Sequence, residues 1–394
     1  MIKIKDIDYL YSELVSNRRF LHENPEIGFN LPNTQKYVIQ RLQEYGISDI
    51  VKVGQFSAVA TIKNGNGPII GLRADMDALP MKEESDNITY CSKNPNTMHA
   101  CGHDAHTAIL LSAAHYLYAH LNEWNGTVKL IFQEAEEGPV PGGAHAIVQS
   151  GVVDDVQVFF GLHCAPNLEV GTFSIKSGEA MASADTFKIV LIGKGAHAAF
   201  PHLGIDPIIM LAETVQAIQT IPSRIINPTD NCVITVAQVH AGTTHNIIPE
   251  SAIMEGTVRT FSASVREKII NEIEKIIKSI TERYGGKYQY EYIRGYDPLI
   301  NQTGPTDYLK NIVRQSFGND ALIAQDKATM GAEDFSKYII HKTGAFVWLG
   351  TSGSADTNYG LHHPRFNIDE KALLYGTALM INLVTNNQNI KEIL

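Results

Sequence analysis

The chain has 394 residues, of which 44% are hydrophobic and 19% are charged, a composition ordinary for a soluble globular protein. This length predicts two domains, at about 100–200 residues for each. The formal net charge of -10 argues against nucleic acid or an anionic membrane surface as a partner. The charged first residues lack the apolar segment of a signal peptide, and no stretch approaches the ~20 apolar residues of a membrane span. We therefore expect a cytoplasmic protein, in which the four scattered cysteines stay reduced.

Strand and helix signals alternate through nearly the first half of the chain and again near its end. An amphipathic helix is predicted over residues 7–15, before a break at Pro25. Short apolar runs predict buried strands at 69–72, 127–133, 156–162 and 346–349. Further helices are expected over about 104–120 and just after Gly143. This alternation predicts an α/β fold with a mixed or parallel sheet covered by helices.

The pattern changes between about residues 180 and 294. The elements predicted there follow the order β-α-β-β-α-β, which is typical of a ferredoxin-like fold. They cover, in chain order, residues 186–192, 206–221, 232–239, 252–261, 264–284 and 287–292. We therefore predict an inserted α+β domain at 180–294, flanked by the two parts of one main domain at 1–179 and 295–394.

The densest group of metal-binding side chains is the run His99-Ala100-Cys101-Gly102-His103, followed by Asp104 and His106. Cys101 and His103 are one residue apart on an extended or turning backbone, so both can point to the same side. A thiolate and an imidazole placed in this way can bind one ion or two adjacent ions. Taken alone, the run is equally a turn before a helix with incidental histidines.

Other polar side chains follow the predicted strands. Their positions, in chain order, are Asp75, Asp77, Glu136, Glu137, His163, His362 and His363. Ligand sites of open α/β sheets form beyond the carboxyl ends of the strands. We therefore expect these groups to gather at one edge of the sheet.

These blocks, in this order, resemble the dinuclear metallo-amidohydrolase and carboxypeptidase family, which contains aminoacylases, hippurate hydrolases, plant auxin-conjugate hydrolases and acetyl-diaminopimelate deacetylases. The similarity covers nearly the whole chain and is closest to the branch that uses Cys and His in its second metal block. The matching motifs are residues 19–22 with 25–26, 71–80, 98–107, 132–144, 161–163, 195–202, 246–249, 256–259, 331–335 and 361–364. The resemblance implies a metallopeptidase-like catalytic domain with a mixed sheet, and an inserted domain that acts as a lid and in dimerisation.

The resemblance also implies a centre of two divalent metal ions in each chain, with Zn, Mn, Co and Ni all compatible. Its implied ligands are Cys101, His103, Glu137, His163 and His362. Glu136 is the implied general base, and Asp77 is a supporting carboxylate. Chemistry agrees, because one of two adjacent carboxylates can bind metal while its neighbour takes a proton from the activated water. The choice between His362 and His363 stays open; we favour His362 as the ligand and place His363 in the lining of the pocket.

The inserted domain has its own implied roles. His197 is implied to cross the interface of a homodimer and to stabilise the oxyanion, which is electrostatic catalysis. Asn246 and Arg259 are implied to grip the α-carboxylate of the substrate, because a guanidinium binds a carboxylate through two parallel hydrogen bonds. Glu333 lies in a loop near the implied site and has no assigned role.

The leading hypothesis is a metal-dependent amidohydrolase that removes the acyl group from N-acyl amino acids, by attack of a metal-activated water with Glu136 as general base. A dipeptidase or carboxypeptidase would use the same site. From other classes, we consider a metal-binding module without activity and a thiol enzyme with Cys101 as the nucleophile. Removal of metal separates these, because a thiol enzyme would survive it.

Overall fold

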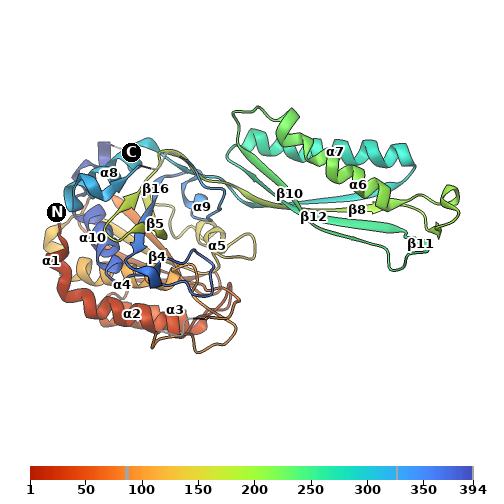
Figure 1. Cartoon of the computed structure of the whole chain (residues 1–394). Helices are drawn as coiled ribbons and strands as arrows, with labels where there is room; N and C mark the ends of the chain where they lie inside the picture. Colours follow the sequence, from red (N-terminus) through yellow and green to blue (C-terminus); the bar gives the residue numbers. More distant parts are fainter. Residues whose placement is uncertain (85–87, 325–326, 393–394) are drawn as a thin grey trace. The chain divides into compact units, whose positions relative to one another are not determined.

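The computed structural model describes residues 1–84, 88–324 and 327–392, which form two compact units (Figure 1). The first unit comprises Met1–Ala180, Ile300–Ala328 and Asp334–Leu394, and the second comprises Met181–Leu299 and Thr329–Glu333. The second unit continues past residue 294 because its last strand runs to Tyr296.

A mixed sheet forms the centre of the first unit. Its strands are β1 (Ile50–Val53), β2 (Ser57–Asn64), β3 (Ile69–Asp75), β4 (Gly126–Gln133), β5 (Val158–Glu169), β6 (Phe173–Ser174), β15 (Leu322–Ile323) and β16 (Thr343–Ser352). Their order across the sheet is β1-β2-β4-β3-β5-β16-β6-β15. The four central strands β4, β3, β5 and β16 run parallel to one another. Their carboxyl ends therefore point the same way, as the sequence predicts for a site-bearing sheet.

Helices cover this sheet, which explains why its strands are apolar along nearly their whole length. The helices are α1 (Ile4–Ile7), α2 (Tyr11–Glu23), α3 (Pro32–Glu44), α4 (His103–Ala119), α5 (Gly143–Gln149), α8 (Thr303–Phe317), α9 (Ser336–Ile339) and α10 (Ala372–Thr385). Helix α4 packs against β3 and β5, and α10 packs against α4 and β16. Because α4 lies among the other elements, it is buried on almost all sides rather than along one stripe.

Three sequence predictions need correction. The strand expected over 69–72 continues to Asp75, because it stays paired with β4 as far as Gln133. The helix expected over 7–15 is interrupted, because the short helix α1 is followed by a 3-10 turn at Asp8–Leu10 before α2 begins. Strand β5 does not end at residue 162 but continues to Glu169, because β16 remains paired with it beyond His163. His163 therefore lies within a strand rather than just after one.

The second unit contains a four-stranded antiparallel sheet with the order β10-β12-β8-β13. Its main elements are β8 (Ala184–Ile192), α6 (Pro207–Ile218), β10 (Cys232–Ala241), β12 (Ser251–Thr260), α7 (Ala263–Tyr284) and β13 (Lys287–Tyr296). Alternate side chains of β8 (Phe187, Ile189 and Leu191) pack with Ile269 and Ile273 of α7. The predicted β-α-β-β-α-β order and the ferredoxin-like α+β class are confirmed.

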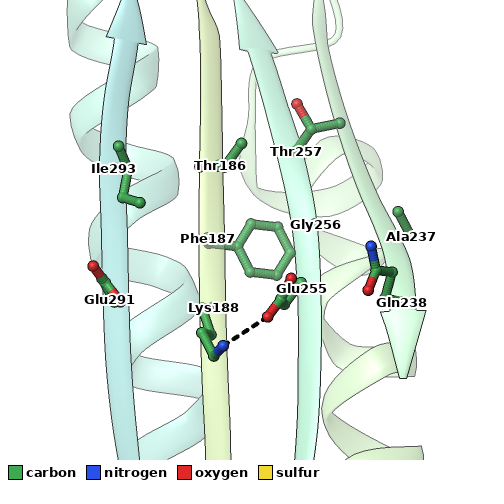
Figure 2. A pocket seen from close by; sticks show the side chains of 10 residues that line it. All are labelled: Thr186, Phe187, Lys188, Ala237, Gln238, Glu255, Gly256, Thr257, Glu291 and Ile293. Carbon is green, nitrogen blue, oxygen red and sulfur yellow. Dashed lines mark ion pairs between the residues drawn. The ribbon is translucent and has the colours of Figure 1, made fainter. Parts of the chain in front are cut away.

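Residues of all four strands, Phe187 among them, line a pocket (Figure 2). Lys188 on β8 and Glu255 on β12 reach toward one another and form an ion pair of 2.8 Å. None of the side chains predicted to form the site lines this pocket. Elsewhere in the fold, none of the described helices is both long enough and apolar enough to span a membrane.

Candidate metal centre

Cys101 and His103 lie on either side of Gly102, the residue just before α4. Gly102 adopts a left-handed conformation with φ of 91°, and a Cβ atom there would come within 3.0 Å of Cys164. Only glycine fits such a position without strain. The turn brings the Sγ atom of Cys101 to 3.3 Å from Nε2 of His163 in β5. The other nitrogen of His163 donates to the carbonyl of Cys164 at 2.9 Å, so its Nε2 lone pair is left to face the thiol.

Asp77 fixes the backbone of the adjacent residues Glu136 and Glu137, which follow β4. Its Oδ1 accepts a hydrogen bond from the amide of Glu136 at 2.9 Å, and its Oδ2 accepts one from the amide of Glu137 at 3.0 Å. Ala135, just before them, has a φ of 52°, which is uncommon for a residue other than glycine. A strained backbone of this kind persists only where the surrounding structure holds it.

His362 joins these residues from a turn late in the chain. Its amide donates to the carbonyl of Ala100 at 2.8 Å, and its Nε2 lies 3.0 Å from Oε1 of Glu137. Its φ is 62°, and it and Ala135 are the two non-glycine residues with positive φ in the described part of the chain. His363 points elsewhere: its ring stacks on Tyr359 with the centroids 4.6 Å apart.

His103 is fully buried among carboxylates. Neither of its ring nitrogens makes a hydrogen bond to the residues that the structure describes. Nδ1 lies 3.4 Å from Asp77, and Nε2 lies 3.7 Å from Asp75 and 4.0 Å from Glu136. Burial lowers the pKa of His103, but Asp75, Asp77 and Glu137 outweigh it and raise this pKa to about 10. So much negative charge around one imidazole favours a bound cation.

Asp75 and His106 also lie within reach of His103, but they already have partners. Asp75 accepts hydrogen bonds from Arg73 and from Nδ1 of His106, each at 2.6 Å. Nε2 of His106 accepts the amide of Cys164 at 2.9 Å. Since both of its ring nitrogens are used, His106 supports the site and does not supply a ligand.

The remaining groups fit a metal centre. Among the predicted ligands and Glu136, three sets have ligand atoms within 4.8 Å of one another, and they share members: Cys101 with His103 and His163, Cys101 with Glu137 and His362, and His103 with Glu136 and Glu137. Thiolate, imidazole and carboxylate are ligands of divalent transition metals.

The raised pKa of the Cys101 thiol argues against a thiol enzyme. Burial, together with the charges of Glu137 and Glu136, holds the pKa of this thiol well above its usual value. A nucleophilic cysteine needs the opposite shift, because the thiolate is the reactive form. A metal ion, by contrast, draws the proton off the thiol when it binds.

The other three predicted residues belong to the second unit. His197 in β9 (Ala196–His197) and Asn246 are exposed, and they lie close together because β9 pairs with β11 (Ile247–Ile248). Arg259 is half-buried near the end of β12, and its guanidinium makes no hydrogen bond or ion pair with any described residue. Burial lowers the pKa of this guanidinium, so an anion beside it would be stabilising.

The sequence model of Peptidase family M20/M25/M40 matches residues 71–386. The chain belongs to this family. It is 38% identical to the N-acetylcysteine deacetylase of Bacillus subtilis (strain 168) over 376 residues, which are 95% of this chain and 96% of that protein. It is 40% identical to the N-acyl-L-amino acid amidohydrolase of Geobacillus stearothermophilus over 296 residues, 75% of this chain and 80% of that one. The crystal structure of the Bacillus subtilis YXEP protein, a dinuclear metal binding peptidase from the M20 family, superposes with a TM-score of 0.83 at 34% identity and covers 96% of this chain and 98% of that one.

Sequence reasoning about this member of family M20/M25/M40 missed the supporting role of Arg73, and it placed Asp75 at the sheet edge without assigning it a role. One signal was present: Arg73 interrupts an otherwise apolar strand, and a charge buried in a strand must be paired. The structure pairs it with Asp75 at 2.6 Å and with Asp334 at 2.8 Å.

We predict that His362→Ala weakens metal binding far more than His363→Ala. The first change removes a donor atom next to Glu137, whereas the second removes a ring that stacks on Tyr359. Equilibrium dialysis of the two variants against a graded series of Zn²⁺ concentrations measures this difference. We expect His362→Ala to lose more than the ~10–100-fold that is typical for a residue that only supports a ligand. Equal losses in the two variants would contradict the assignment.

Proposed function

We propose that this protein is a metal-dependent amidohydrolase that removes the acyl group from N-acyl amino acids. The observation that carries the proposal is the pair Glu136 and Glu137, whose amides are both held by Asp77 while Glu137 contacts His362. This arrangement separates a metal-binding carboxylate from a neighbouring carboxylate that can move protons. The names of the relatives at 38% and 40% identity support the substrate class.

In this proposal Cys101, His103, Glu137, His163 and His362 hold two divalent ions. When bound, the ions would polarise the amide carbonyl and lower the pKa of a water molecule to about 7. Glu136 takes a proton from the attacking water and returns it to the leaving nitrogen. Asp77 keeps Glu136 pointing into the cluster by holding its amide. Zn²⁺ suits the thiolate and imidazole ligands, and Mn²⁺, Co²⁺ or Ni²⁺ are compatible with the same set.

The proposed substrate carries a free α-carboxylate, which Arg259 and Asn246 bind. The support is the half-buried guanidinium of Arg259, which is unpaired among the described residues. Asp185, whose charge acts on this guanidinium, is already bonded to Arg266 and Tyr292. A carboxylate would supply the two hydrogen bonds that this guanidinium lacks. His363, which is exposed, is also proposed to contact the substrate.

We further propose a homodimer formed through the second unit, in which His197 completes the site of the partner subunit and stabilises the oxyanion. Exposed apolar side chains surround this exposed histidine. Phe200, Leu203 and Ile247 are 52%, 59% and 56% exposed. The ring of Phe200 is 5.5 Å from that of His197, and Ile247 pairs with His197 across two short strands. Such a patch is typical of a protein interface.

A dipeptidase or carboxypeptidase is the second candidate, favoured by the peptidase name of the matching family. Its substrates also end in a free carboxylate, and the same residues would act on them. Kinetics with matched N-acetyl, N-benzoyl and dipeptide substrates distinguish the two. We place the enzyme in the cytoplasm, where its four cysteines, all unpaired in the structure, stay reduced.

We expect Glu136→Gln to keep its metal while kcat falls by at least about 10²–10⁴, the usual share of general acid and base catalysis. Turnover of N-acetyl amino acids and metal content per chain are the two measurements. Glu137→Gln is the matched control, since losing a ligand should lower both. Removing metal from the wild type with a chelator should abolish activity. Near-normal turnover in Glu136→Gln would refute the assignment of Glu136 as general base.

Arg259→Ala should raise the KM for N-acyl amino acids by about 10–100-fold, because a lost charge-assisted hydrogen bond costs ~1.5–3 kcal/mol. The corresponding N-acyl amino acid amides lack the carboxylate, so their KM should change much less. Steady-state kinetics on matched acid and amide pairs test this, with Arg259→Lys as the control that keeps the charge. If the two substrate classes suffer equally, Arg259 does not bind the carboxylate.

The composite site predicts complementation between two inactive variants. His197→Ala and Glu136→Gln should each have little activity as homodimers. After subunit exchange, one site of each heterodimer combines an intact Glu136 with an intact His197 from the partner. We therefore expect activity to return when the two are mixed, with heterodimers counted by native mass spectrometry. Heterodimers without recovered activity would show that His197 does not act across the interface.

A further inference from the structure

Glu134, two residues before the proposed general base, is fully buried beside the turn that joins β1 and β2. Its Oε1 accepts a hydrogen bond from the amide of Gln55 at 2.8 Å, and its Oε2 accepts one from the amide of Phe56 at 2.6 Å. Its own amide donates to Oγ of Ser57 at 3.1 Å. A carboxylate is costly to bury unless it is bonded in this way, so the contact is a specific clamp between the end of β4 and this turn.

The backbone at Glu134 is also held from the opposite side, by the start of α5. The amide of Gly143 donates to the carbonyl of Ala135 at 3.2 Å. A Cβ atom at Gly143 would come within 1.9 Å of the carbonyl oxygen of Glu134, so the two backbones are in close contact. Glu134 and Ala135 are thus enclosed between the β1–β2 turn and α5.

We propose that Glu134 is a positioning residue that keeps Ala135 in its left-handed conformation and thereby aims Glu136 and Glu137 into the metal cluster. The inference rests on the roles proposed above for those two carboxylates. Asp77 holds their amides from the far side of Ala135, so the strained residue is fixed at both ends. Without the clamp, Ala135 can relax to negative φ and turn the following peptide. A displacement of ~1 Å at a reacting group can cost about 10²-fold in rate.

Binding of Co²⁺ to the metal-free protein tests this without relying on activity. Thiolate-ligated Co²⁺ has visible absorption bands that report the geometry of its ligands. We expect Glu134→Ala to weaken Co²⁺ binding by about 10–100-fold and to change these bands. Glu134→Gln keeps one acceptor oxygen and should be intermediate. In the loaded enzyme kcat should fall by a similar factor while KM stays within about two-fold, because alignment rather than substrate binding is lost.

Glu26→Gln is the matched control in the same unit. The carboxylate of Glu26 also accepts two backbone amides, those of Asn33 at 3.0 Å and Thr34 at 2.8 Å, but they belong to the start of α3. This variant should lower the midpoint of thermal unfolding and leave the Co²⁺ bands unchanged. A purely structural Glu134 would behave in the same way.

Gly54→Ala tests the same contact from the β1–β2 turn. A Cβ atom at Gly54 would lie 2.1 Å from Oε1 of Glu134 and would push the carboxylate off the two amides. Introduced into the wild-type protein, Gly54→Ala should therefore reproduce the loss of Co²⁺ affinity that Glu134→Ala causes. Introduced into the Glu134→Ala variant, it should lower that affinity little further. If Glu134→Ala does not fold, Gly54→Ala in the wild type and Glu134→Gln decide the matter.

Two results would overturn the inference: wild-type Co²⁺ affinity and bands in folded Glu134 variants, or fully additive effects of Gly54→Ala and Glu134→Ala. Failure of the wild-type protein to bind Co²⁺ at all is a different outcome, because it would refute the proposed function itself.

Discussion

The hydrogen bonds from the amides of Glu136 and Glu137 to Asp77 are the interaction on which the candidate site depends. They join the ends of β4 and β3, which are neighbours because the two strands pair in parallel from Ile69 to Asp75. The single carboxylate of Asp77 thereby sets the direction of two others. It acts together with the left-handed Ala135, and the strain at that residue is stable only because the chain is held on both sides of it.

Buried charge explains most of the remaining architecture around the site. Arg73 is paired with Asp75 and Asp334, and Arg18 donates to Asp104 at 2.9 Å, so these carboxylates are compensated within the protein. An excess of negative charge remains around His103, and it raises the pKa of that imidazole although burial lowers it. An uncompensated charge is expensive in a protein interior, and a divalent cation is the compensation that thiolate, imidazole and carboxylate donors are suited to bind.

The second unit contributes a different kind of chemistry. Its sheet is an ordinary ferredoxin-like scaffold with an apolar core. Yet the half-buried guanidinium of Arg259 has no partner among the described residues, and His197 is exposed among apolar side chains. Neither feature stabilises the unit by itself. Both are consistent with groups that find their partners only in a substrate or in a second copy of the chain.

The sequence by itself determined the fold class, the β-α-β-β-α-β order of the inserted block and the chemistry of the 99–106 run, because these depend on local apolar periodicity and on which donor atoms are present. Tertiary structure decided the length of β5, since pairing with β16 carries that strand past His163. It also distinguished His362 from His363. The amide of His362 donates to the carbonyl of Ala100, about 260 residues earlier in the chain, and the left-handed conformation of His362 then directs its imidazole to Glu137. The support given by Arg73, Asp75 and Glu134 was beyond sequence reasoning for the same physical reason. Each acts through a hydrogen bond to an atom that only the packing of distant elements brings within reach.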